Sequence, residues 1–143
     1  MESQVKNNYP WRLLDIPHIR DESGELCIVE RSNFFPFEFE RFIYVHDVPE
    51  TAKRAEHAHK VIDEVVIALA GGFDVLVDNG EITEKIKMES PNTGLYIPRM
   101  VWISLESFKQ GTVYLVVTSG GYNEREHIRD YQEFLSIVHS TKE

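Results

Sequence analysis

The chain has 143 residues, of which 42% are hydrophobic and 27% charged, and these shares are ordinary for a globular protein of one domain. Its formal net charge of −9 argues against a nucleic-acid-binding surface, because phosphate backbones require a basic stripe and none is visible. The single cysteine, Cys27, excludes an intrachain disulfide, and no apolar run has the length of a membrane span or of a signal-peptide core, so we expect a soluble, cytoplasmic protein.

Short apolar runs separated by turn residues follow one another along most of the chain. The runs are rich in Val, Ile, Tyr and Phe, which favour strands. Eight strands are predicted, at residues 26–30, 42–46, 65–70, 73–77, 84–88, 94–97, 101–105 and 112–118. Asn79-Gly80, between two of these runs, predicts a hairpin with a two-residue turn. Strands at this regular spacing indicate an antiparallel all-β sandwich or barrel.

The C-terminal segment has a different period. Asn123 and Glu126 have the spacing of a helix-capping pair. Apolar side chains then recur at helical intervals, at Ile128, Tyr131, Phe134, Leu135 and Val138. The sequence therefore predicts a single all-β domain over residues 1–143 with one C-terminal α-helix lying on the sheet.

The stretch EHAHKVIDE, residues 56–64, carries the clearest candidate site. On a strand His57 and His59 project to the same side, and Glu64 follows close enough to converge on them. The pattern H-x-H, four residues, E, six residues, G ends at Gly71. This pattern resembles the first signature of the cupin superfamily, and the resemblance implies a jelly-roll antiparallel β-barrel with its core at about residues 24–134.

The second cupin signature is degraded. Gly94 and Pro98 are in place, but Met100 and Ile103 stand where a glycine and a histidine are expected. Cupin metals usually use two histidines and the glutamate of the first signature and the histidine of the second. A metal site made of His57, His59 and Glu64 is therefore one alternative, because three ligands with an open position suffice for a catalytic metal.

A closer resemblance covers most of the chain. The segments GELCIVE, PFEFERFIYV, RAEHAHK, GGFDVLVDNGE, GLYIPRMVW and YNEREHIRDYQEF, in this order, are similar to the sugar nucleotide 3,4-ketoisomerases. That family moves the ketone of dTDP-4-keto-6-deoxyglucose from C4 to C3 in deoxyaminosugar biosynthesis. The resemblance implies an isomerase without metal or other cofactor, a nucleotide-sugar substrate and a homodimer.

The resemblance also assigns roles to individual residues. It makes His59 the principal base and His57 the group that donates or relays protons between sugar oxygens, and it places Tyr44 in the site. An imidazole suits proton transfer at neutral pH because its ordinary pKa is near 6.5. Arg54 and Arg41 match family arginines.

Arginine is well shaped for the diphosphate of a nucleotide sugar, because a guanidinium can bind phosphate oxygens bidentately. Besides the two arginines that match the family, Arg99 beside Pro98 is a third candidate for this contact.

Three departures from the family pattern bear on activity. Ala55 stands where the family has glycine, Ile43 replaces one of two tyrosines, and Ile103-Ser104 replaces a His-Glu pair. The loss at Ile103-Ser104 keeps open a non-catalytic protein that binds a nucleotide sugar. Glu64, where the family often has glutamine, keeps open a metal-dependent cupin.

Overall fold

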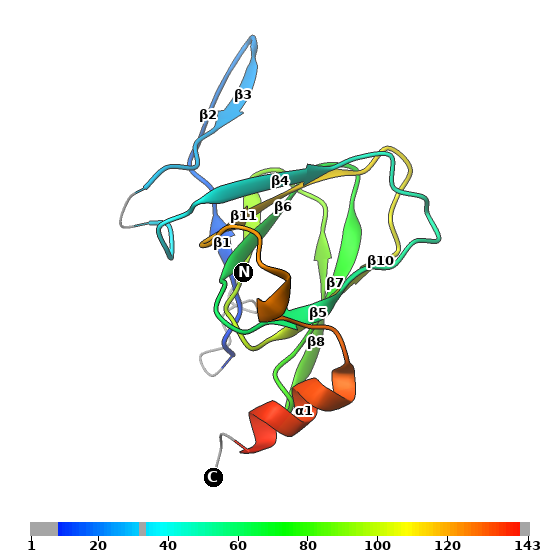
Figure 1. Ribbon diagram of the computed structural model, residues 1–143. Helices are drawn as coiled ribbons and strands as arrows, with labels where there is room; N and C mark the ends of the chain where they lie inside the picture. Colours follow the sequence, from blue (N-terminus) through cyan, green and yellow to red (C-terminus); the bar gives the residue numbers. More distant parts are fainter. Residues whose placement is uncertain (1–8, 32–33, 141–143) are drawn as a thin grey trace.

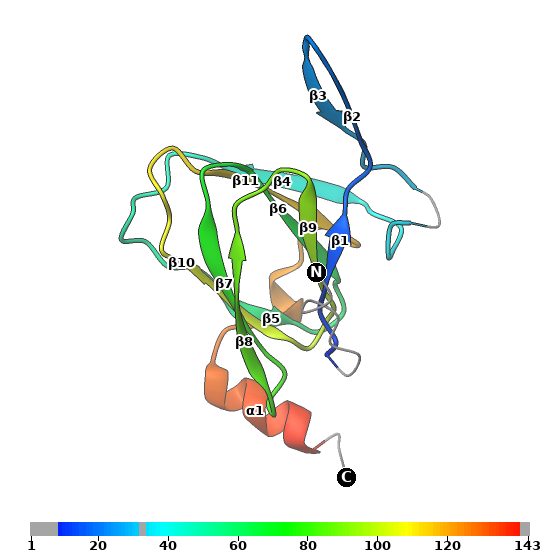
Figure 2. The same ribbon diagram turned by 180° about the vertical axis from the view of Figure 1, so that it is seen from behind.

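The computed structural model describes residues 9–31 and 34–140, and it is built mainly from two five-stranded antiparallel sheets (Figures 1 and 2). The first has the order β1-β9-β6-β11-β4, with β1 at Arg12–Asp15, β9 at Thr93–Ile97, β6 at Glu64–Ala70, β11 at Val113–Thr118 and β4 at Arg41–Val45. The second has the order β12-β5-β10-β7-β8, with β12 at His127–Ile128, β5 at Arg54–His59, β10 at Trp102–Glu106, β7 at Phe73–Asp78 and β8 at Thr83–Met88. The predicted all-β antiparallel class is confirmed.

The main core lies between the two sheets. Strands β6 and β7 supply much of it, because their runs of Val, Ile, Ala and Phe are buried on both sides of the pleat. Side chains of β9 and β10 complete this cluster, and Phe108 and Tyr114 close it at one end. A second apolar cluster on the outer face of the first sheet joins β1 to phenylalanines that precede β4.

A two-stranded hairpin stands apart from the barrel. It is formed by β2 (His18–Asp21) and β3 (Gly24–Cys27), and both ribbon views show it projecting away from the sheets (Figures 1 and 2). Strand β3 overlaps only the start of the predicted strand 26–30. The other seven predicted strands match observed ones. Strands β1, β2 and β12 had no counterpart in the prediction, and β5 was anticipated only as the strand that carries His57 and His59.

The turn at Asn79-Gly80 is wider than predicted. Asp78 pairs with Thr83, so four residues rather than two connect β7 to β8. The Asn79 side chain accepts hydrogen bonds from the backbone N–H groups of Glu81 and Ile82, which stabilises the longer loop. The two-residue prediction is therefore wrong, although the hairpin itself is present.

The C-terminal helix is present but shorter than predicted. Asn123 caps a 3-10 turn at Glu124–Glu126, and Ile128 belongs to β12. Helix α1 spans Tyr131–Ser140, where the Asp130 carboxylate accepts from the N–H of Gln132.

The apolar face of α1 packs beneath the second sheet. Phe134 and Val138 lie against Ala58 of β5 and Ile128 of β12, and Figure 1 shows the helix at that end of the barrel. None of the helices in the described ranges is long and apolar enough to cross a membrane.

Gly71, the last residue of the histidine motif, is required by the turn between β6 and β7. Its φ is +74°, and a Cβ atom there would lie 2.7 Å from the Cα of Thr112. Both the left-handed backbone and the close approach of Thr112 favour glycine at this position. The segment that contains Thr112 leaves no room for the side chain of any other residue. The motif glycine thus positions β6, which carries Glu64.

Candidate active site

Strand register places the candidate residues on levels inside the barrel. Arg41 pairs with Thr118, and Thr118 pairs with Glu64, so these three residues lie on one level across β4, β11 and β6. Two residues further along these strands lie Ile43, Val116 and Val66, and the level after that contains Tyr114. In the facing sheet His57 pairs with Ile103.

These levels enclose a pocket of about 140 Å³ in the barrel interior. Four polar side chains line it, namely those of Arg54, His57, Glu64 and Tyr114. The rest of the wall is apolar and consists of Ile43, Val45, Ala55, Val66, Ile103, Leu105 and Val116. A small apolar cavity with a few convergent polar groups is the usual form of a ligand or active site.

His57 projects into this pocket beside an apolar wall. Ile103, which occupies the position of the family histidine, is buried and directly opposite it. Burial lowers the pKa of His57 from its ordinary 6.5 to about 4, although the charge of Glu64 opposes the shift. His57 is therefore a neutral imidazole near neutral pH, with a lone pair available to accept a proton.

His59 lies deeper, clamped between two carboxylates. Its Nε2 is 2.8 Å from Glu64 Oε2, and its Nδ1 hydrogen-bonds Glu126 Oε2. Burial by itself disfavours the charged imidazole, but the hydrogen bonds and charges of the two glutamates outweigh it and raise the His59 pKa. His59 is 5% exposed and contributes no atom to the pocket lining.

The Glu126 carboxylate is fixed by the backbone of the β5–β6 loop. Its Oε1 accepts from the N–H groups of Lys60 at 3.1 Å and Val61 at 3.2 Å. Burial alone would raise the Glu126 pKa, yet the hydrogen bonds from His59 and Val61 lower it below its ordinary value. Glu126 is therefore an ionised, immobile acceptor behind His59.

The backbone that leads to the histidines adopts an uncommon conformation. Ala55 and Glu56 have φ values of 69° and 53°, and the pairing of β5 with β10 shifts register at this point. A left-handed φ costs a non-glycine residue roughly 1–2 kcal/mol. This bulge lets both Arg54 and His57 line the pocket, and it accounts for the family's glycine at the position of Ala55.

Arg54 and Tyr114 form a polar pair at the far level of the pocket. The Arg54 Nε donates to the Tyr114 hydroxyl at 2.8 Å. Burial raises the Tyr114 pKa, and the neighbouring guanidinium only partly opposes this, so the hydroxyl keeps its proton. Because the oxygen already accepts from Arg54, that proton is free to be donated to a ligand.

Of the other two predicted substrate-binding arginines, Arg41 lies beside the pocket and Arg99 lies away from it. Arg41 is on the pocket side of β4, its buried Nε has no hydrogen-bond partner in the described structure, and its guanidinium lies 5.9 Å from the ring centroid of Tyr122. Arg99 lies on the exposed surface and pairs with Asp63, with Nη2 to Oδ2 at 3.2 Å. Arg54 and Arg41 thus flank the pocket, whereas Arg99 is not brought to it.

Tyr44 points away from the pocket. It is 70% exposed and stacks on His46, while its neighbours Ile43 and Val45 face inward, as the alternation of a strand requires. The hydroxyl in the pocket belongs instead to Tyr114 of β11. The catalytic role predicted for Tyr44 therefore receives no support from its position.

Two further residues escaped the sequence analysis. Glu126 and His127 come from the segment before α1. In the pairing of β12 with β5, His127 lies opposite His59. The His127 ring centroid lies 5.1 Å from that of His57 and 4.7 Å from that of His59. The EREH segment gave no signal by itself, because its charges suit a solvated helix equally well.

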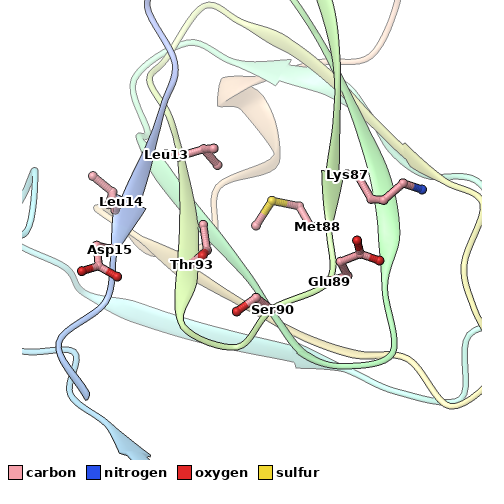
Figure 3. Close-up of a pocket in the computed structure, with 8 residues that line it drawn as sticks. All are labelled: Leu13, Leu14, Asp15, Lys87, Met88, Glu89, Ser90 and Thr93. Carbon is pink, nitrogen blue, oxygen red and sulfur yellow. The ribbon is translucent and has the colours of Figure 1, made fainter. Parts of the chain in front are cut away.

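A larger cavity lies away from the histidines. It has a volume of about 530 Å³ and lies between β1 and β9 on one side and β8 on the other, where the edges of the two sheets meet (Figure 3). Asp15 and Glu89 line it with a single cation, Lys87, whose amine is 3.4 Å from Asp74. An anionic nucleotide is disfavoured there.

Comparisons with known proteins agree with this geometry. The family model described as FdtA, WxcM-like, C-terminal, matches residues 9–139. A relative from Aneurinibacillus thermoaerophilus, a TDP-4-oxo-6-deoxy-alpha-D-glucose-3,4-oxoisomerase, is 32% identical over 127 residues, which cover 89% of this chain and 91% of the relative.

Solved structures with the same fold are sugar isomerases. A 3,4-ketoisomerase from Helicobacter canadensis is 34% identical, with a TM-score of 0.88 over 91% of this chain and 98% of its own. QdtA from Thermoanaerobacterium thermosaccharolyticum, a sugar 3,4-ketoisomerase solved with TDP, is 29% identical, with a TM-score of 0.89 over 94% and 98%. A histidine-to-asparagine variant of QdtA is known in complex with TDP-4-keto-6-deoxyglucose. The chain therefore belongs to the FdtA family of WxcM-like, C-terminal proteins.

Proposed function

We propose that this protein is a TDP-sugar 3,4-ketoisomerase that acts on a TDP-4-keto-6-deoxyhexose. The observation that carries the proposal is the pocket in which a neutral imidazole, a protonated phenol and a carboxylate converge inside an apolar barrel. The family membership and the substrate names of its relatives support the same reaction.

The reaction exchanges a ketone and a neighbouring alcohol. A base removes the proton from C3, the electrons form an enediolate across C3 and C4, and a proton returns to C4. The proton on the C3 oxygen leaves and the C4 oxygen gains one, so that the ketone ends at C3 and atoms balance without an oxidant. The protein must therefore supply a base and a donor for the developing oxyanion.

His57 is the better placed base. Its ring lines the pocket and is uncharged near neutral pH, whereas His59 is not part of the pocket lining and both of its nitrogens already bind carboxylates. We therefore assign to His57 the carbon proton transfer that the resemblance gives to His59. The hydrogen-bonded Glu64–His59–Glu126 chain then acts as a buried relay that exchanges protons with the sugar oxygens.

Tyr114 supplies the donor for the enediolate oxygen. Its hydroxyl accepts from Arg54 and directs its own proton into the pocket. A well-placed donor of this type contributes on the order of 3–4 kcal/mol to transition-state stabilisation. Arg54 and Arg41, at opposite ends of the pocket, are available for the diphosphate, and their charge compensates that of an acidic protein.

The experiment is proton NMR of TDP-4-keto-6-deoxyglucose incubated with EDTA-treated protein in D₂O. We expect a 3-keto sugar to form and deuterium to enter C3 or C4. His57→Asn should abolish both changes. His59→Asn should slow conversion while leaving measurable deuterium exchange at C3.

His46→Asn is the matched control, because His46 is exposed and lies outside the pocket. Full exchange in His57→Asn would return the role of the base to His59. Binding of the sugar nucleotide without any conversion by the wild-type protein would favour the non-catalytic alternative, in which the apolar Ile103 has removed an essential proton donor.

We also propose that the protein acts as a homodimer. The β2–β3 hairpin exposes Ile19 and Leu26, 59% and 55% exposed, with no barrel strand paired to it in the described chain. Strand β4 is a sheet edge whose outer side exposes Phe42 and Tyr44. A hairpin alone is only marginally stable in water, so a second copy is the natural partner for both surfaces.

A further inference from the structure

Three imidazole rings meet at the inner end of the pocket. His57 and His59 come from β5 and His127 from β12, and one ring nitrogen from each lies within 4.8 Å of the others. The sequence gave His127 no role, and the proposed isomerase reaction does not use it. Histidine is the commonest metal ligand in proteins, and three histidines form the ligand set of some catalytic zinc sites.

Two of these rings have buried nitrogens without partners. The Nδ1 atoms of His57 and His127 are inaccessible and make no hydrogen bond within the described ranges. The His127 side chain is only 7% exposed, and its nearest carboxylate oxygens, on Glu126 and Glu124, are 3.8 and 3.9 Å away. Such atoms are rare in native structures and call for a missing partner.

The carboxylates beside His59 match the surroundings of a metal site. A ligating histidine usually donates its second N–H to a carboxylate, and each nitrogen of His59 faces one. The separation of His59 Nε2 and Glu64 Oε2, 2.8 Å, needs to widen by only about 0.6 Å to reach the roughly 3.4 Å between ligand atoms around a tetrahedral metal with bonds of about 2.1 Å. Glu126, held by two backbone N–H groups, can then orient His59 from behind.

We propose that His57, His59 and His127 bind a divalent transition-metal ion such as Zn²⁺, with Glu64 as the fourth ligand. Three imidazoles and one carboxylate select zinc-like metals rather than Mg²⁺ or Ca²⁺, which require oxygen ligands. The rings must approach by about 1 Å to reach bonding distance, a movement that side-chain rotation supplies. The third imidazole comes from β12, so this ligand set differs from the one predicted from the H-x-H motif.

Metal binding and isomerisation use the same lone pair. A neutral imidazole has a single lone pair, so an ion bound at the buried Nδ1 of His57 keeps the ring proton on Nε2 and leaves no lone pair to take the sugar proton. The loaded protein should therefore isomerise more slowly. This consequence rests on the proposed function, whereas metal binding itself does not. The site therefore makes the pocket sensitive to zinc-like ions.

The test is isothermal titration of Zn²⁺ into EDTA-stripped, dialysed full-length protein, together with the visible spectrum of the Co²⁺-loaded form. We expect one ion per chain and the intense visible absorption of a four-coordinate Co²⁺ site. His127→Gln should weaken binding at least tenfold and lose this absorption, while the exposed His46→Gln should match the wild type. Circular dichroism would verify that each variant is folded.

Glu64→Gln is a second variant that tests the same site should His127→Gln fail to fold, and it should weaken binding about tenfold or more. Absence of one-to-one binding by the wild type, or equal affinity in His127→Gln, would overturn the proposal. The isomerase rate of each variant is measured with Zn²⁺ and compared with the metal-free rate of the same variant. This comparison separates the metal-site proposal from the isomerase proposal. A stripped protein that is inactive but binds Zn²⁺ contradicts only the isomerase.

Discussion

Whether a side chain can take part in the chemistry of the pocket depends on the face of the strand on which it lies. Tyr44 and Tyr114 illustrate this, because both carry a phenol but only Tyr114 projects between the sheets, where it meets Arg54. On the neighbouring strand Ile43 occupies the inward position that a second family tyrosine would fill. In the proposed reaction, the hydroxyl that serves the sugar therefore comes from Tyr114 of β11.

Replacing Tyr114 by Phe should lower kcat on the order of 10²-fold with little change in KM. The variant keeps the ring in the apolar cluster but removes the donor for the enediolate, whose contribution appears mainly in the transition state. Steady-state kinetics with TDP-4-keto-6-deoxyglucose provide the measurement. A larger loss in Tyr44→Phe than in Tyr114→Phe would restore the role that the family resemblance suggests for Tyr44.

Replacing Ala55 by Gly should raise the free energy of unfolding by about 0.5–1 kcal/mol. The left-handed φ of 69° costs alanine roughly 1–2 kcal/mol, and the greater freedom of glycine in the unfolded chain offsets part of that gain. Urea unfolding of both proteins would measure the difference. Ala52→Gly is the control, since Ala52 has no positive φ and should only lose stability; a stabilisation of equal size there would contradict the strain argument.

At the level of secondary structure, the sequence predicts most strands and their approximate positions, but it does not predict which strands pair with one another. Nearly continuous apolar runs identify β6, β7 and β11, because their burial dictates their composition. The two residues of β12 have no periodicity of their own, and they form a strand only because β5 offers a free edge. For the same reason Glu126 and His127 could not be assigned to the site before the fold was known.

Helix α1 is attached to the barrel at its first residue. The Tyr131 hydroxyl donates to the Asp78 carboxylate, and its ring packs edge-on against Trp102. The hydrogen bond to this carboxylate, more than burial, raises the pKa of Tyr131 to about 12. The folded state therefore holds the phenol proton more tightly than the unfolded chain does.

Tyr131→Phe should lower the free energy of unfolding by about 1 kcal/mol at pH 8, a modest value because the pair is partly exposed to solvent. A raised pKa stabilises the fold below pH 10, and this stabilisation is lost as pH rises from about 10 towards 12. The difference between wild type and variant, measured by urea unfolding at pH 8 and pH 11, should therefore shrink at pH 11. A constant difference would show that Tyr131 acts by packing alone.

At the scale of the whole molecule, the barrel provides a rigid interior, and two of the unpaired surfaces outside it bear on assembly. One is the β2–β3 hairpin, and the other is the free edge of β4, whose inward face carries Arg41 and Ile43 of the site. Because one strand serves both the edge and the pocket, pairing of β4 with a second copy would also stiffen the pocket wall. Assembly and activity should therefore be coupled.

The double variant Ile19→Lys, Leu26→Lys should shift the protein from dimer to monomer. Both side chains are more than half exposed on the hairpin, so the change costs the isolated fold little but places two charges in the proposed interface. Light scattering after size-exclusion chromatography gives the mass of each species. The control is Val61→Lys, a change of equal character at a residue 57% exposed in the loop after β5. If the hairpin variant elutes as the wild type does, or if the wild type is itself a monomer, the hairpin is not the dimer contact. If the hairpin variant becomes monomeric and loses isomerase activity while Val61→Lys keeps both, the second copy supports the pocket, as the position of β4 implies.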